Sequence, residues 1–125
     1  MKILAIDLGH TIGFAVLSDH ALAGYGIVPL GQAHTIKSQV PVIDLMVIER
    51  PAYRERPDIQ ARYEAEIHSL RVLYVGKVIK VARPADWMPR FGHHPLPERG
   101  VLKTQHEKDA YRMAHWALDK FGGQT

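Results

Sequence analysis

The sequence predicts an α/β domain in which helices flank a mixed five-stranded sheet. Three observations lead to this fold class. Short apolar runs separated by turns fill residues 1–49, which is typical of strands. Residues 58–74 and 104–121 instead repeat their apolar residues at helical spacing. A further apolar run at 77–82 lies between these two segments, so strands and helices alternate in the second half of the chain.

Four strands are expected in the first half of the chain. Residues 2–8 (KILAIDL) form a nearly continuous apolar run, as in a central strand that is covered on both faces. Residues 12–18 and 21–30 follow after short turns, so the first three strands are expected to form an antiparallel meander. Residues 31–41 allow a short helix or none, and residues 42–48 (VIDLMVI) predict a fourth, buried strand.

The second half predicts a helix, a fifth strand and a final helix. Residues 58–74 are expected to form the first of these helices, with Asp58 as its cap, and residues 77–82 the strand. Residues 83–103 contain four prolines, so we expect a long loop with at most one helical turn. The last helix is predicted to begin with the capping-box pattern T-x-x-E at residues 104–107.

Length and composition limit the class of protein. A chain of 125 residues predicts one domain, residues 1–125, that is large enough to bury a core. Apolar content of 46% and charged content of 23% are ordinary for a soluble globular domain. The absence of cysteine excludes disulfides and thiolate metal sites and is compatible with a reducing cytoplasm. No apolar run is long enough for a membrane span or a signal sequence, so we expect a cytoplasmic protein with no membrane partner.

The positive charge is concentrated in the middle of the chain. Residues 1–49 carry two Lys against four Asp or Glu, whereas residues 50–112 carry thirteen Lys or Arg against eight Asp or Glu. A basic region around a few acids suits a nucleic-acid surface that surrounds a carboxylate site. A merely well-solvated surface explains the same charges, so this alternative stays open.

Two carboxylates stand at the ends of predicted strands. Asp7 lies near the end of the first apolar run, and Glu49 follows the fourth. A buried ionised carboxylate is costly unless it is paired or bound to metal. If the two strands are adjacent and parallel, both side chains emerge at the same edge of the sheet, where open α/β sheets bind their ligands.

The last predicted helix supplies a second pair of polar residues. His106 and Asp109 are three positions apart, so they share one face of the helix. The same face continues into the apolar stripe that we expect to pack against the sheet. The first turn of the helix can therefore deliver both side chains to the edge that carries the two carboxylates.

Together these residues form an oxygen-rich set that suits Mg²⁺, with Mn²⁺ as a substitute. Asp7, Glu49, His106 and Asp109 are predicted to be both catalytic and metal-binding, with two ions per active site and no organic cofactor. Two such ions about 4 Å apart can act on both oxygens of an in-line phosphoryl displacement. Each residue alone also has an ordinary explanation, such as a turn acid or a favourable charge at a helix start. The prediction depends on all four falling at convergent positions.

Three segments carry a family resemblance. Residues 3–17 (ILAIDLGHTIGFAVL) are similar to a block with a catalytic Asp, a Gly turn and a returning strand. Residues 47–51 (VIERP) are similar to a block that bears a catalytic Glu. Residues 105–118 (QHEKDAYRMAHWAL) are similar to a C-terminal helix block, in which an acid or a His is followed three residues later by Asp. In this order, the three segments resemble the RuvC-like branch of the ribonuclease H-like superfamily.

The resemblance implies a ribonuclease H-like fold and a crossover junction endodeoxyribonuclease that resolves four-way (Holliday) DNA junctions by symmetrical phosphodiester hydrolysis. It also implies a homodimer, a divalent-metal site at the four residues above, and a role in DNA recombination and repair. The chain departs from the family around residues 31–41, where a first helix would lie and where typical cellular members are longer. A compact, phage-type member is our interpretation of this difference.

Basic and aromatic residues near the predicted site are candidate DNA contacts. Arginines can bind the phosphates beside the scissile bond. Tyr53 matches, with an offset of one residue, an aromatic that the family places past the catalytic Glu; packing on the adjacent helix is its alternative role. Trp87 and Phe91 are assigned to the core in preference to DNA. The candidates for nucleic-acid binding are Arg50, Tyr53, Arg54, Arg56, Arg83, Arg90 and Lys103.

Other functions remain open at this point. A ribonuclease H-like nuclease of the ribosomal RNA maturation type has a similar opening (IDLGHTIGFAVLSD), although Glu49 and the His106/Asp109 pair argue against it. A non-catalytic module that binds branched DNA is the second alternative, and the four intact ligands argue against it. A phosphate-binding ATPase half-domain is disfavoured, because 125 residues cannot supply two lobes.

Overall fold

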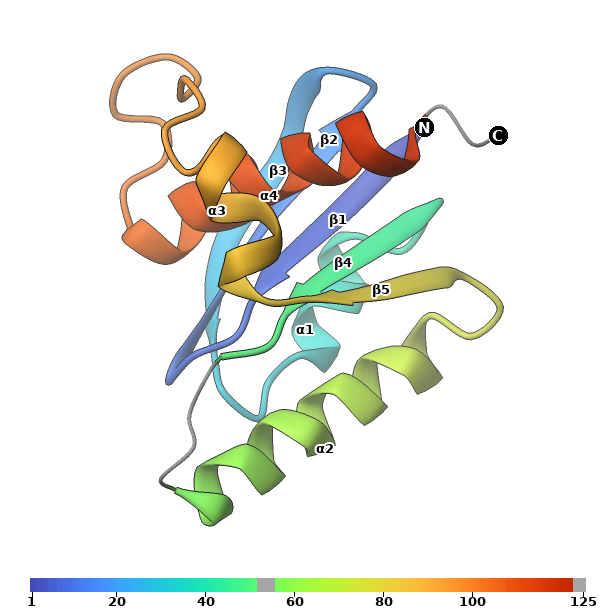
Figure 1. Ribbon diagram of the computed structural model, residues 1–125. Coiled ribbons are helices and arrows are strands. Elements are labelled where there is room, and N and C mark those ends of the chain that lie inside the picture. The colour runs from blue at the N-terminus through green and yellow to red at the C-terminus, as the bar shows by residue number, and fades with distance from the viewer. Residues whose placement is uncertain (52–55, 123–125) are drawn as a thin grey trace.

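Within residues 1–51 and 56–122, which the computed structural model describes, five strands form one mixed sheet with helices on both faces (Figure 1). In this part of the chain the strands are β1 (Lys2–Asp7), β2 (Thr11–Ser18), β3 (Ala21–Pro29), β4 (Leu45–Glu49) and β5 (Val78–Ala82), and the helices are α1 (His34–Gln39), α2 (Pro57–Leu73), α3 (Pro84–Phe91) and α4 (Gln105–Phe121). The strand order is β3-β2-β1-β4-β5. β1, β2 and β3 are antiparallel neighbours, whereas β4 runs parallel to both β1 and β5. This arrangement confirms the predicted fold class.

Two apolar clusters lie on opposite faces of the sheet. α1 and α2 cover one face, and α3 and α4 cover the other (Figure 1). The central strand β1 contributes to both, because Leu4 and Ile6 belong to the first cluster and Ile3 and Ala5 to the second. All four side chains are completely buried. The apolar run of β1 is therefore nearly continuous, as expected for a strand that is covered on both faces.

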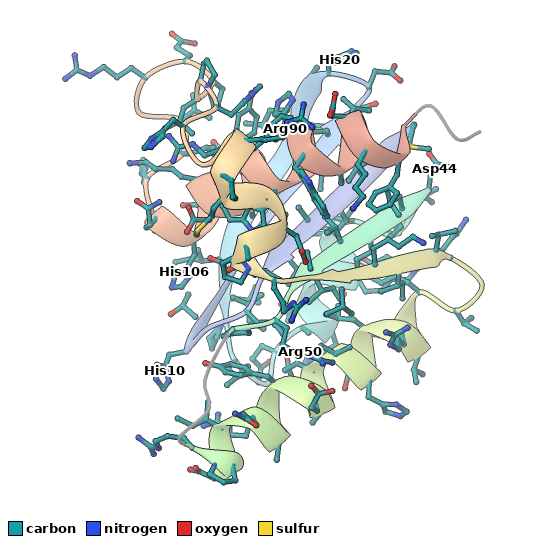
Figure 2. All side chains as sticks on the ribbon, in the orientation of Figure 1. His10, His20, Asp44, Arg50, Arg90 and His106 are labelled. Atoms are coloured by element: carbon teal, nitrogen blue, oxygen red, sulfur yellow. The ribbon has the colours of Figure 1, made fainter. Side chains whose placement is uncertain are left out.

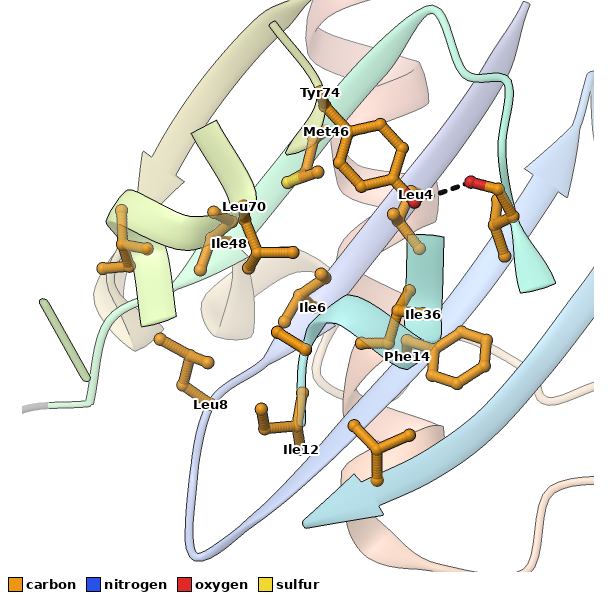
Figure 3. Packing of buried hydrophobic residues seen from close by; sticks show 14 of the residues in the cluster. Leu4, Ile6, Leu8, Ile12, Phe14, Ile36, Met46, Ile48, Leu70 and Tyr74 are labelled. Atoms are coloured by element: carbon orange, nitrogen blue, oxygen red, sulfur yellow. Dashed lines mark hydrogen bonds between the residues drawn. The ribbon is translucent and has the colours of Figure 1, made fainter. Parts of the chain in front are cut away.

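A buried tyrosine hydrogen bond connects two parts of the apolar cluster that α1 and α2 cover. The hydroxyl of Tyr74 donates to the backbone carbonyl of Val40 at 2.6 Å (Figure 3). This bond ties the end of α2 to the segment that follows α1. Ile36 brings α1 into the same cluster, so the short helix that the sequence allowed at 31–41 is present and packs against the core.

Two element boundaries differ from the sequence expectation. α2 begins at Pro57 with Arg56 as its N-cap residue, so the assignment of Asp58 as the cap is wrong. Proline is favoured at the first helical position because it has no N–H that would need a partner. β4 begins at Leu45 and not at residue 42, and the preceding Asp44 accepts the backbone N–H at the start of β1 at 2.7 Å.

The segment 83–103 contains more regular structure than its prolines indicated. α3 is longer than the single turn that we expected, since Pro84 stands at its start, where no N–H is needed. The carboxylate of Asp86 accepts the backbone N–H of Arg83 at 2.8 Å and stabilises the first turn. Residues 92–103 form no further helix or strand. None of the helices in residues 1–51 and 56–122 is long and apolar enough to cross a membrane.

Candidate active site

The carboxyl ends of β1 and β4 bring two acidic side chains together. In the parallel ladder, Asp7 is the direct partner of Glu49, and neighbouring strands lie about 4.8 Å apart. Both residues are nearly buried, with 5% of Asp7 and 7% of Glu49 exposed. The structure therefore places the two carboxylates at the same edge of the sheet, as the sequence predicted.

The first turn of α4 lies directly on β2. A Cβ atom added at Gly13 would come within 2.5 Å of the backbone carbonyl carbon and the Cβ of His106, so a glycine is needed for this close approach. Gly13 is also the β2 partner of Asp7. The close approach allows His106 to reach Asp7, and His106 Nδ1 lies 2.8 Å from Asp7 Oδ2 (His106 is labelled in Figure 2).

Asp109 joins the group from the same helix. The side-chain amide of Gln105 donates to Asp109 Oδ1 at 2.8 Å. All four predicted site residues share one cavity of about 410 Å³. The cavity is lined by Asp7, Leu8, Gly9, His10, Thr11, Glu49, Pro51, Pro84, His106 and Asp109. Residues from β1, β4 and α4, far apart in the sequence, thus meet at one place.

Burial and mutual repulsion raise the pKa of two of these acids. Removal from water raises the pKa of Asp7, and the charge of Asp109 raises it further. Burial also raises the pKa of Glu49, followed by the charge of Asp7, while a hydrogen bond from Trp87 opposes the shift. Ionisation of Asp7 and Glu49 at the same time is therefore costly unless a cation compensates their charges.

The donor set fits a hard divalent cation in its chemistry. The carboxylate oxygens of Asp7, Glu49 and Asp109 are the ligands that Mg²⁺ and Mn²⁺ prefer, and a cation would relieve their repulsion. In residues 1–51 and 56–122, no three His, Asp or Glu side chains are arranged so as to hold a metal ion as they stand. Metal binding at this cavity stays a prediction and requires side-chain rotation.

A tryptophan that the sequence reasoning placed only in the core also reaches the site. The indole Nε1 of Trp87 donates a hydrogen bond to Glu49 Oε2, and the Trp87 side chain is 1% exposed. Local sequence patterns gave no signal for this contact, because Trp87 comes from α3, within the segment expected to be a loop. The general rule that a buried indole N–H finds an acceptor was the available hint.

Two of the predicted DNA contacts lie near the cavity. Arg50 leaves the end of β4 and forms an exposed ion pair with Glu64 of α2, with a distance of 2.9 Å between Nη2 and Oε1 (Figure 2). Arg83 is exposed immediately before α3, whose first residue lines the cavity. Tyr53 and Arg54 lie outside the described residues.

None of the predicted DNA contacts within residues 1–51 and 56–122 lines the cavity itself. Arg56 pairs with Asp58 at 3.6 Å near the start of α2. Arg90 pairs with Asp119 at 3.5 Å, near the end of α4 that is opposite to the site (Figure 2). Lys103 lines a separate cavity of about 550 Å³, formed mainly by residues 96–103. The structure thus brings three carboxylates and one imidazole together at the cavity, whereas the basic residues are spread over a wider surface.

The strand order defines the class of fold. An antiparallel meander that is extended by two parallel strands is the arrangement of the ribonuclease H-like fold. The structure of RuvC from Thermus thermophilus is similar to this chain, with a TM-score of 0.73 and 14% identity over 98% of this chain and 97% of that one. The structure of T. thermophilus RuvC in complex with a Holliday junction substrate gives a TM-score of 0.78 and 13% identity over the same shares of both chains. No family model and no curated protein matches the sequence.

Proposed function

We propose that this protein is a divalent-metal-dependent endodeoxyribonuclease that resolves four-way DNA junctions by symmetrical phosphodiester hydrolysis. One observation carries the proposal: Asp7 and Glu49 are direct partners on adjacent parallel strands, and α4 brings His106 and Asp109 to the same cavity. The similarity of the fold to RuvC, one of whose structures is a complex with a Holliday junction substrate, supports the choice of DNA as the substrate.

The four site residues have distinct roles in this proposal. Asp7, Glu49 and Asp109 hold the cations through their carboxylate oxygens. When bound, Mg²⁺ or Mn²⁺, two ions per site, lower the pKa of the attacking water and stabilise the leaving 3′ oxygen. His106 orients the Asp7 carboxylate through the contact at 2.8 Å and is a further candidate ligand.

The surrounding surface binds the DNA backbone. Arg50 and Arg83 lie near the cavity, so they bind the phosphates next to the scissile bond. From the sequence, Arg54 is assigned to the phosphates beside the scissile bond, and Tyr53 to stacking on a base of the opened junction. Arg56, Lys103 and Arg90 contact the phosphates of the junction arms at a greater distance from the cavity.

A homodimer is part of the proposal, because symmetrical cutting of two strands needs two sites. Analytical ultracentrifugation of the protein with and without a junction tests this part. A monomer in both samples would contradict it.

The compact, phage-type assignment rests on the short segment between β3 and β4, which contains only the six-residue helix α1.

Cleavage of a synthetic immobile four-way junction, beside a matched linear duplex, tests the function. The assay compares Mg²⁺, Mn²⁺ and EDTA, and it compares the parent protein with Asp7→Asn. Asp44→Asn is the matched control, since Asp44 lies at the opposite end of the sheet and its hydrogen bond to the Lys2 backbone can be kept by asparagine (Figure 2).

We expect paired, symmetrical nicks on the junction from the parent protein and from Asp44→Asn, and none with EDTA or Asp7→Asn. Binding of the junction with no cutting under any metal condition would indicate a non-catalytic binding module. Cutting of structured RNA but not of the junction would indicate an RNA-processing nuclease. Either result from a folded protein would overturn the proposal.

A further inference from the structure

A neutral hydrogen-bond donor is buried against one of the candidate catalytic carboxylates. The indole N–H of Trp87 donates to Glu49 Oε2, and neither side chain is more than 7% exposed. Trp87 belongs to the apolar cluster between the sheet, α3 and α4, where a free N–H would be costly. Packing therefore holds the indole ring in place, with its N–H directed at Glu49 Oε2.

The same segment also fixes the backbone next to Glu49. The backbone N–H of Arg50, the residue after Glu49, donates to the carbonyl of Ala82 at 2.8 Å, and Ala82 ends β5. α3 begins two residues after Ala82. The main chain and the side chain at the end of β4 are thus both bound by the short stretch from Ala82 to Trp87.

The donor has a chemical property that matters at a cation site. An indole N–H carries no net charge and does not titrate, so it stabilises the ionised carboxylate without neutralising it. A lysine or arginine at the same place would compete with a cation for the charge of Glu49. The indole hydrogen bond engages Oε2, and the Glu49 carboxyl group also shares a hydrogen bond with the Asp7 side chain. Trp87, Glu49 and Asp7 therefore form one connected network at the cavity.

We propose that Trp87 is a positioning residue for the Glu49 carboxylate: its N–H holds Oε2, so that the carboxylate stays beside Asp7 at the cavity, where a divalent cation would bind. This inference rests on the proposed function, because it requires a cation at that site. Such partners of metal ligands typically change metal affinity or activity by about 10- to 100-fold when they are removed.

The sequence contains two tryptophans, which makes a direct optical test available. In Trp116→Phe, Trp87 is the remaining tryptophan and reports on the site. Trp116 is itself buried in the same apolar cluster, but it contacts Phe121 at the far end of α4. We expect Mg²⁺ to produce a saturable change in Trp87 emission that is absent in Trp116→Phe combined with Glu49→Gln. In Trp87→Phe, the emission of Trp116 should not respond to Mg²⁺.

A shape-matched replacement separates the N–H from the packing. In the Trp116→Phe background, benzothienylalanine at position 87 retains the size of the indole but cannot donate. We expect the Mg²⁺ concentration that half-saturates the thermal stabilisation to rise by about 10-fold or more, with little change in the melting temperature of the metal-free protein. Trp116→Phe alone should leave this concentration unchanged.

Two results would overturn the positioning role. One is a Trp87 emission that does not respond to Mg²⁺ although Mg²⁺ raises the melting temperature. The other is a half-saturating concentration within about twofold of the Trp116→Phe value after the benzothienylalanine replacement. If Mg²⁺ and Mn²⁺ affect neither the stability nor the activity of the parent protein, the proposed function fails, and the positioning role fails with it.

Discussion

The contact between Gly13 and the start of α4 gives a prediction that links stability to activity. Gly13→Ala places a Cβ atom 2.5 Å from the carbonyl carbon and Cβ of His106, and 2.6 Å from its carbonyl oxygen. Carbon atoms pack at about 3.5–4.0 Å, so the first turn of α4 must move by roughly 1 Å. The move is resisted, because these are backbone atoms of a helix that is buried along its length.

We expect Gly13→Ala to lower the free energy of unfolding by about 1–3 kcal/mol, the usual cost of overpacking in a core. For a domain of this size that corresponds to roughly 4–12 °C in melting temperature. The same shift moves His106 and Asp109 away from the acids on the sheet. A displacement of about 1 Å at a catalytic group can reduce the rate by roughly 100-fold.

Gly24→Ala is the matched control, because its added Cβ would meet Val16 at an ordinary 3.7 Å on the neighbouring strand. Differential scanning calorimetry and the junction-cleavage assay, run on both variants under the same conditions, measure the two effects. The reasoning is refuted if Gly13→Ala melts and cuts like Gly24→Ala.

Three further predictions concern charge, pH and a buried hydrogen bond. Asp7→Asn removes a buried charge that is repelled by its neighbours, so in EDTA it should raise the free energy of unfolding by about 1 kcal/mol and abolish any stabilisation by Mg²⁺; a lower melting temperature in EDTA would contradict this. Burial, followed by the charge of His94, lowers the pKa of His115 to about 4. Because this value lies below that of the unfolded chain, the parent is expected to lose about 1–2 kcal/mol of stability as the pH falls from about 6.5 towards 4, after allowance for partial exposure. His115→Gln lacks this titration, so the urea midpoint of the parent should fall relative to that of the variant over the same range; a difference between the two midpoints that does not change with pH would contradict this. Tyr74→Phe removes the hydrogen bond of 2.6 Å to Val40 and should cost about 1–2 kcal/mol in urea unfolding with no change in cleavage rate, and an equally stable variant would show that the bond contributes nothing.

Most of the fold could be predicted because local patterns and tertiary structure agree. The apolar run of β1 indicated a strand covered on both faces, and helices cover both faces. The capping box at the start of α4 is formed, with Thr104 Oγ1 accepting the backbone N–H of Glu107 at 3.1 Å. In both cases the sequence pattern lies within the element that it specifies.

The meeting of the four site residues was predictable for the same reason. Asp7 and Glu49 interrupt apolar runs at strand ends, and His106 and Asp109 extend the buried face of a helix into its first turn. A parallel pairing of β1 with β4 was the one assumption needed, and the structure has this pairing.

The contacts that the sequence could not show are those made between elements. Nothing near Trp87 in the sequence indicates a contact with Glu49, and the prolines around Trp87 concealed the helix α3. The ion pair of Arg90 is also a contact between two elements, so the local sequence does not show it. Arg90 was considered a DNA contact on its charge alone, whereas its partner Asp119 lies 29 residues further along the chain, at the far end of α4.

The direct pairing of Asp7 with Glu49 has a consequence for how chains of this kind can vary in length. An insertion of one residue within β1 or β4 would turn one carboxylate to the opposite face of the sheet, and an insertion of two would separate the pair by about 6.6 Å along the strands. Insertions between β3 and β4 have neither effect, because residues 30–44 lie outside all five strands of the sheet. Related chains can therefore lengthen or shorten the region around α1 freely while the distance between the two acids stays the same.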